Sequence, residues 1–90
     1  MSPRVTLRLP TPLRTWAGGE GAPTVRGATA ATAVEDLVDR HPGLRALVLD
    51  EQGRLRERLA LFHRGDRLRE LDRCLAPGDV LDLVPLMAGG

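Results

Sequence analysis

The residues best suited to chemistry are the two glycines that end this sequence, Gly89 and Gly90. The stretch from Val84 onward carries no charged side chain. Glycine has no Cβ, so a Gly-Gly pair fits a narrow channel and adopts backbone angles that other residues avoid. The last six residues can extend on the order of 20 Å from Pro85. This pattern predicts a slim tail that delivers the Gly90 carboxylate to the active site of a partner protein.

The other candidates for chemistry stand alone. Cys74 is the one cysteine, so the chain has no internal disulfide. We interpret it as a small residue beside a turn, because only Arg73 adjoins it and reactive thiols need strongly cationic surroundings. His41 and His63 are far apart and match no metal-ligand spacing, which predicts no metal site. No catalytic residue is expected in this chain.

Composition excludes two further classes of partner. The thirteen basic residues are all arginines and are interspersed with twelve acidic ones, for a net charge of +1. A nucleic-acid binder needs a patch of one sign, often with stacking aromatics, and here Trp16 and Phe62 are the only aromatic residues. The sequence has neither a secretory signal nor a membrane-spanning run. We therefore expect a cytoplasmic protein that binds neither nucleic acid nor membranes.

The first half of the chain predicts a hairpin followed by a helix. Apolar residues alternate with polar ones in RVTLRLP (4–10), as in a strand with one buried face. The turn-forming WAGGEGAP (16–23) predicts a long loop, and Thr24–Arg26 a short return strand. A helix then ends at RHPG (40–43). Thr32 with Glu35 fits a capping box at its start, and Thr29 is the competing start.

The second half predicts three more strands. LRALVLDEQG (44–53) fits either a short strand or a helical turn. A second hairpin surrounds HRGD (63–66), and DVLDLVP (79–85) is the final strand. The order is therefore β-β-α-β-β-β, an α+β fold in which one main helix covers a sheet. The apolar helix stripe should meet apolar strand residues: Val34, Leu37 and Val38 against Val5, Leu7, Leu9, Leu59, Leu61 and Leu83.

With this order, the ending PGDVLDLVPLMAGG (77–90) resembles the ubiquitin-like β-grasp sulfur carriers over essentially the whole chain. That family includes the thiamine-pathway carrier, the small subunit of molybdopterin synthase and the cysteine-biosynthesis carrier. The opening LPTPLRTWAGGEG (9–21) is most similar to the cysteine branch. The resemblance implies a mixed β-grasp sheet over residues 1–84 and an extended, flexible tail over 85–90.

The resemblance also implies an activity and a set of partners. An ATP-dependent activating enzyme would adenylate the carboxylate of Gly90. Sulfide from a persulfide donor would then convert it to a thiocarboxylate, which donates sulfur to an acceptor synthase. The chain itself would bind no cofactor and act as a carrier or synthase subunit rather than as an enzyme. The residues implied for the partner's channel are Pro85, Leu86, Met87, Ala88 and Gly89, with Phe62 in a docking surface.

Two other functions fit the same residues. The chain could be a covalent modifier that is joined through Gly90 to lysines of target proteins. It could also be a non-covalent β-grasp interaction module whose tail has no role. The sequence leaves these alternatives open, together with the biosynthetic pathway.

Overall fold

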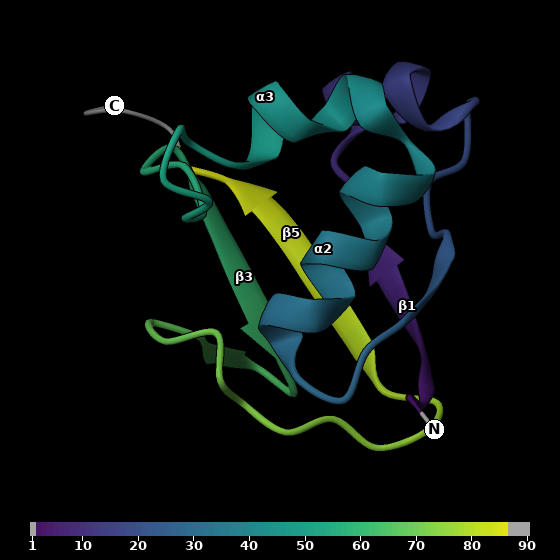
Figure 1. Ribbon diagram of the computed structural model, residues 1–90, viewed down its shortest axis with the longest axis vertical. Coiled ribbons are helices and arrows are strands. Elements are labelled where there is room, and N and C mark those ends of the chain that lie inside the picture. The colour runs from purple at the N-terminus through teal and green to yellow at the C-terminus, as the bar shows by residue number, and fades with distance from the viewer. Residues whose placement is uncertain (1, 87–90) are drawn as a thin grey trace.

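The alternating apolar residues form a mixed sheet with one buried face. The computed structural model describes residues 2–86, and its five strands have the order β2-β1-β5-β3-β4 (Figure 1). β1 pairs antiparallel with β2 and parallel with β5, and β3 runs antiparallel to β5 and β4. The strands are β1 (Arg4–Arg8), β2 (Thr24–Arg26), β3 (Leu59–His63), β4 (Asp66–Arg67) and β5 (Val80–Pro85). The predicted β-β-α-β-β-β order and the α+β class are confirmed.

The main helix, α2 (Ala30–Arg40), crosses one face of the sheet (Figure 1). Its capping box is formed by Thr29 and Thr32: the Thr32 amide donates to Thr29 Oγ1 at 3.2 Å, and the Thr29 amide donates to Thr32 Oγ1 at 3.0 Å. The predicted Thr32–Glu35 box is therefore wrong, and the competing start at Thr29 is confirmed. Alanines at 30 and 31 are strong helix formers and let the helix start one turn earlier. Glu35 is instead free to pair with Arg45.

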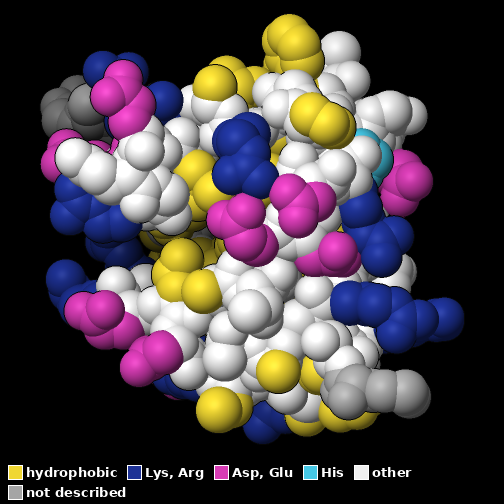
Figure 2. Space-filling view, viewed as in Figure 1, with side chains coloured by type: hydrophobic (Ala, Val, Ile, Leu, Met, Phe, Trp, Pro, Cys, Tyr) yellow, Lys and Arg dark blue, Asp and Glu magenta, His cyan; other side chains and the backbone are white. Residues whose placement is uncertain are grey.

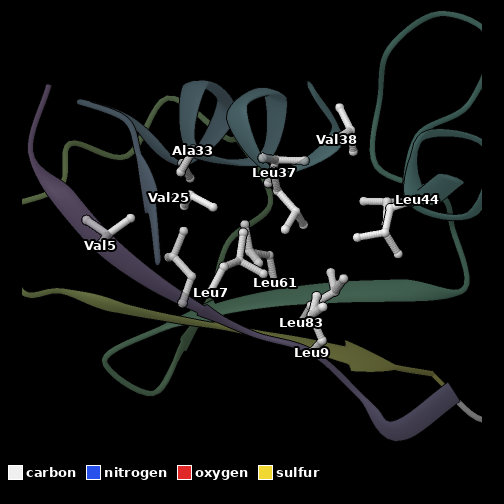
Figure 3. Packing of buried hydrophobic residues seen from close by; sticks show 14 of the residues in the cluster. Val5, Leu7, Leu9, Val25, Ala33, Leu37, Val38, Leu44, Leu61 and Leu83 are labelled. Carbon is white, nitrogen blue, oxygen red and sulfur yellow. The ribbon is translucent and has the colours of Figure 1, made fainter. Parts of the chain in front are cut away.

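The core lies between α2 and the inner face of the sheet, as Figure 3 shows. Leu37 points from the helix toward Leu7 and Leu61, and all three are fully buried. Burial of such a side chain contributes roughly 1.5–3 kcal/mol. The helix stripe and the strand residues predicted to meet it form one continuous buried cluster. Leu59 is the exception, because it is only partly buried against that cluster. The predicted members of the cluster are Val34, Leu37, Val38, Val5, Leu7, Leu9, Leu61 and Leu83.

Two segments are more helical than their composition suggests. A short helix, α1 (Thr11–Arg14), lies between β1 and the expected loop (16–23), and a 3-10 turn, η1 (Thr15–Ala17), extends into the start of that loop. Pro12 lies in the first turn, where its missing amide hydrogen costs nothing, and Gly18 ends the turn at φ 66°. Residues 42–48 form the 3-10 turn η2 (Pro42–Leu44) and the helix α3 (Arg45–Val48). The helical alternative for that segment is thus the correct one.

The close approach of β2 to α2 depends on Gly27. A Cβ at this position would lie 2.3 Å from the Ala33 amide nitrogen and 2.6 Å from its Cα. Both are backbone atoms of α2, so a side chain could be accommodated only if the helix moved. We expect Gly27→Ala to destabilise the fold by about 1–3 kcal/mol, as overpacking does. This should lower the Tm by roughly 4–8 °C per kcal/mol in thermal unfolding.

Gly21→Ala is the matched control for that measurement. Its added Cβ would come within 2.9 Å of Arg14 Nε, which belongs to a long side chain that can turn aside. We expect a much smaller change in Tm. Equal losses in the two variants would contradict the tight packing at Gly27.

Candidate functional site

The end of β5 positions the tail. β1 pairs with β5 only as far as Asp82, whereas β3 follows it to Pro85, which lies opposite Leu59. One residue further, the Leu86 amide donates a hydrogen bond of 2.7 Å to the Arg58 carbonyl. The chain is thus held to β3 on one side until Leu86. Met87, Ala88, Gly89 and Gly90, which the sequence predicts to enter a partner, lie outside the described residues.

A groove of about 530 Å³ lies beside this last anchored residue. The groove is lined on its apolar side by Leu47, Leu59 and Leu86, and on its polar side by Glu57 and Arg58. Leu47 is exposed on α3. A partner that receives the tail can therefore contact apolar and charged side chains at the same point. This groove could not be predicted from the sequence, because its lining residues come from α3, the loop that follows it, β3 and β5.

The outer face of the sheet, opposite α2, carries an apolar strip. Val80 and Val84 of β5 are 39% and 37% exposed, so both present apolar surface to solvent on this face. Phe62 of β3 is half-buried on the same face, across from Asp82. Asp82 in turn pairs with Arg8 at 3.1 Å. The structure thus brings the predicted docking residue Phe62 onto the face that leads along β5 to the tail.

A polar network fixes the other end of β5, and the sequence analysis missed it. His63 is 4% exposed, and its Nε2 lies 2.9 Å from Asp79 Oδ2. Arg73 Nη1 lies 3.2 Å from His63 Nδ1. A guanidinium only donates, so Nδ1 accepts and Nε2 carries the hydrogen that Asp79 receives. Asp79 also accepts from the Ala76 amide at 2.8 Å. The only sequence feature that pointed to this network was the turn Pro77-Gly78-Asp79, which contains Asp79.

The Asp79 carboxylate makes the fold acid-sensitive. The Ala76 amide, then His63 and Arg64, lower its pKa from 3.8 to about 2. A depressed pKa stabilises the fold fully above pH 4, and that stabilisation is lost as the pH falls from about 4 toward 2. We expect the Tm to drop over this window, with a smaller pH dependence in Asp79→Asn. An equal slope in both proteins would contradict this assignment.

The remaining candidate residues lie away from the tail. Cys74 is exposed. Its backbone forms an isolated antiparallel β-bridge with Thr29, near the start of α2 and at the end of the sheet where β5 begins. His41 caps the C-terminus of α2, with its amide donating to the Leu37 carbonyl. Within residues 2–86, no three His, Cys, Asp or Glu side chains are placed to hold a metal ion. In the same range no helix has the length and apolarity to cross a membrane.

Charges of both signs are mixed on the helix side of the molecule. Arg45 pairs with Glu35 at 3.0 Å and with Asp39 at 2.9 Å, and Arg40 pairs with Asp36 at 2.7 Å. Figure 2 shows acidic and arginine side chains interspersed over α2. This face therefore offers no continuous patch of one sign.

The fold and the placement of β5 define a small β-grasp domain of the ubiquitin-like type. No family model and no curated protein sequence matches the chain. Solved structures do. CysO in the BexX/CysO complex of Amycolatopsis orientalis is 32% identical, with a TM-score of 0.84 over 96% of this chain and 99% of that one.

Two further solved structures are similar to this chain over nearly its whole length. SAMP1 of Haloferax volcanii is 29% identical, with a TM-score of 0.83 over 97% of this chain and 99% of that one. Mycobacterium tuberculosis CysO is 25% identical, with a TM-score of 0.82 over 92% and 99%. The chain belongs to the ubiquitin-like β-grasp sulfur carriers, as the resemblance implied. These relatives are small carrier or modifier proteins.

Proposed function

We propose that this protein carries sulfur as a thiocarboxylate on Gly90. The observation that supports this most strongly is the course of β5, which runs along an exposed apolar face and leads toward a Gly-Gly end. In this proposal residues 1–84 form the globular carrier and residues 85–90 form an extended tail, whose first two residues, Pro85 and Leu86, lie along β3. The carrier is a co-substrate of other enzymes and has no catalytic residue of its own.

The chemistry follows from the poor reactivity of a carboxylate. The Gly90 carboxylate attacks the α-phosphate of ATP on the activating enzyme, which releases pyrophosphate and leaves an acyl adenylate. The outer sulfur of a persulfide donor displaces AMP and forms an acyl disulfide. A reducing thiol then attacks the donor's sulfur in that disulfide, which releases the thiocarboxylate, a good sulfur nucleophile, and leaves the donor and the thiol joined as a disulfide. ATP is thus consumed by the partner and is not a bound cofactor of this chain. Gly89 and Ala88 suit a narrow channel because their side chains are minimal.

The tail and the outer sheet face act together in this proposal. The Leu86–Arg58 hydrogen bond fixes where the tail leaves the fold. Val84 and Phe62 provide apolar area for the activating enzyme and the acceptor synthase. Likeness to two CysO proteins favours a cysteine-type pathway over a molybdopterin-type one, and in this proposal the carrier works in the cytoplasm.

Likeness to SAMP1, a small archaeal modifier protein, supports a second candidate function. The same activated Gly90 could be joined to lysines of target proteins. The chain contains no lysine, so copies of it could not be linked to one another through side-chain amines. A modifier of this kind would attach as single units, except at its α-amine.

Reconstitution separates the candidates. The chain is incubated with its activating enzyme, ATP, a persulfide source and a reducing thiol, and its intact mass is measured, with the persulfide source omitted as the control. Exchange of one oxygen for sulfur at Gly90 supports the carrier. Residues 74–90 found joined through Gly90 to lysines of other proteins, after trypsin digestion of an extract of the producing cell, support the modifier. Neither change, together with full function after deletion of Gly89 and Gly90, would overturn both.

The apolar strip on the outer sheet face gives a prediction that does not depend on the reconstitution result. Val84→Asp places a charge on the apolar strip beside the tail, and we expect thiocarboxylate formation to slow roughly tenfold to a hundredfold, as for an interface hot spot. Val84→Ile keeps the surface apolar and should retain the rate. The side chain is exposed, so both variants should keep the parent's Tm within about 3 °C. Unchanged loading of Val84→Asp would exclude this face from the interface.

A further inference from the structure

Two arginines lie directly opposite each other on the edge of the sheet. Arg4 of β1 is the register partner of Arg26 of β2, and both side chains are exposed on the outer face. Like charges directly opposite in an antiparallel pair destabilise the sheet. The fold therefore carries an unfavourable contact at this point, where most other residue pairs would be more stable.

A third arginine reaches the same place from the helix. Arg40, the last residue of α2, lines one hollow of about 310 Å³ with Arg4, Thr24 and Arg26. Its Nε donates to Asp36 Oδ2 at 2.7 Å, and the same oxygen accepts the Arg26 amide at 2.8 Å. Asp36 thus holds Arg40 by one nitrogen. We call the hollow and its three arginines the basic corner.

The basic corner has more positive charge than the fold neutralises. Asp36 is the one carboxylate that contacts it, and within residues 2–86 neither Arg4 nor Arg26 forms an ion pair. Of the ten arginines outside the corner five form ion pairs, Arg8, Arg45 and Arg64 among them. Guanidinium groups are rigid forks that bind planar carboxylates with two parallel hydrogen bonds. The site is therefore complementary to carboxylates.

The geometry points to an acidic segment of a partner protein as the ligand, and we propose that the basic corner binds one. The hollow is open at the β2 edge of the sheet, between outer-face residues of β1 and β2 and the end of α2. A protein seated on the outer face can therefore reach it by extending over that edge. This inference goes beyond carriage of sulfur, because the corner is remote from the tail. Arg4 lies two residues before the level of Val80 along the sheet, so it is roughly 20–25 Å from Pro85.

Titration with a short poly-glutamate peptide tests the proposal. The full chain is labelled with ¹⁵N, and the backbone amide and arginine Nε–H resonances are followed at low ionic strength. We expect saturable shifts concentrated at Arg4, Thr24, Arg26 and Arg40. The double variant Arg4→Gln/Arg26→Gln should bind about fivefold to tenfold more weakly. Its Tm should stay equal or rise, since the like-charge pair is gone.

Arg69→Gln is the matched control, because Arg69 is exposed and does not line the corner; it should bind the peptide as the parent does. Shifts spread over arginines elsewhere, or unchanged binding by the double variant, would overturn the proposal. So would saturation of the corner by inorganic phosphate at a lower concentration than peptide carboxylate, which would indicate a small-oxyanion site. Peptide binding measured in this way involves no sulfur, so its result does not depend on whether Gly90 carries sulfur. Deletion of residues 87–90 should therefore leave the peptide affinity unchanged.

Discussion

A single tryptophan appended after Gly90 is expected to abolish sulfur loading. One more residue moves the terminal carboxylate by about 3.3–3.6 Å, and a misplacement of about 1 Å can already cost around a hundredfold in rate. The bulky side chain also blocks a channel that suits glycine. We expect ATP–pyrophosphate exchange by the activating enzyme to fall at least about a thousandfold.

The same tryptophan placed before Met1 is the control, since the start of β1 lies at the opposite end of the sheet from the end of β5 (Figure 1). That variant should be loaded at the parent rate. Intact mass must show that the appended residue is retained throughout the assay. Normal exchange by a chain that still carries it would remove Gly90 from the chemistry.

Leu37→Ala is expected to have the largest effect on stability. Leu37 is fully buried at the centre of the core, between α2 and the sheet. Such a truncation costs about 2–5 kcal/mol, a large part of the roughly 5–15 kcal/mol that stabilises a domain. Urea unfolding should show the loss as a lower midpoint with little change in slope.

Leu47→Ala makes the same chemical change where the side chain is 38% exposed, so little cavity forms. We expect it to cost no more than about 1 kcal/mol. A loss as large as that of Leu37→Ala would mean that Leu47 packs more deeply than the structure shows, and a small loss in Leu37→Ala would contradict the described core.

The arrangement of the fold could be predicted because its elements have clear periods. Val5, Leu7 and Leu9 alternate, while Val34, Leu37 and Val38 recur at helical spacing, and each pattern permits one buried face. The start of α2 was left open between two threonines, at 29 and 32, because each could cap it, and the structure places it at Thr29. The capping pattern alone does not decide between these two threonines. The alanines at 30 and 31, which lie between them, are strong helix formers and favour the earlier start.

The parts of the site that escaped prediction are made by contacts distant in sequence. His63 and Asp79 are sixteen residues apart and meet because β3 and β5 pair. Arg4, Arg26 and Arg40 converge from two strands and a helix. The charge pattern along the chain is mixed throughout, so a local excess at one corner is visible only once the sheet register is known.

The mass of the C-terminal tryptic peptide tests the central claim most directly. Arg73 is the last basic residue, so trypsin releases residues 74–90 as one piece from protein isolated from its own cells. That piece contains Cys74 and Met87 as well as Gly90. A persulfide on Cys74 would add a whole sulfur atom, whereas a thiocarboxylate exchanges oxygen for sulfur.

Oxidation of Met87 gives the same nominal mass gain as that exchange, so fragment ions must decide between them. Our account predicts that fragments ending at Met87 or Ala88 keep their unmodified mass and that the gain appears only with Gly90. Met87→Leu should leave the gain in place. A gain already present at Met87, or an unmodified peptide from cells that are actively using the protein, would contradict sulfur carriage by Gly90.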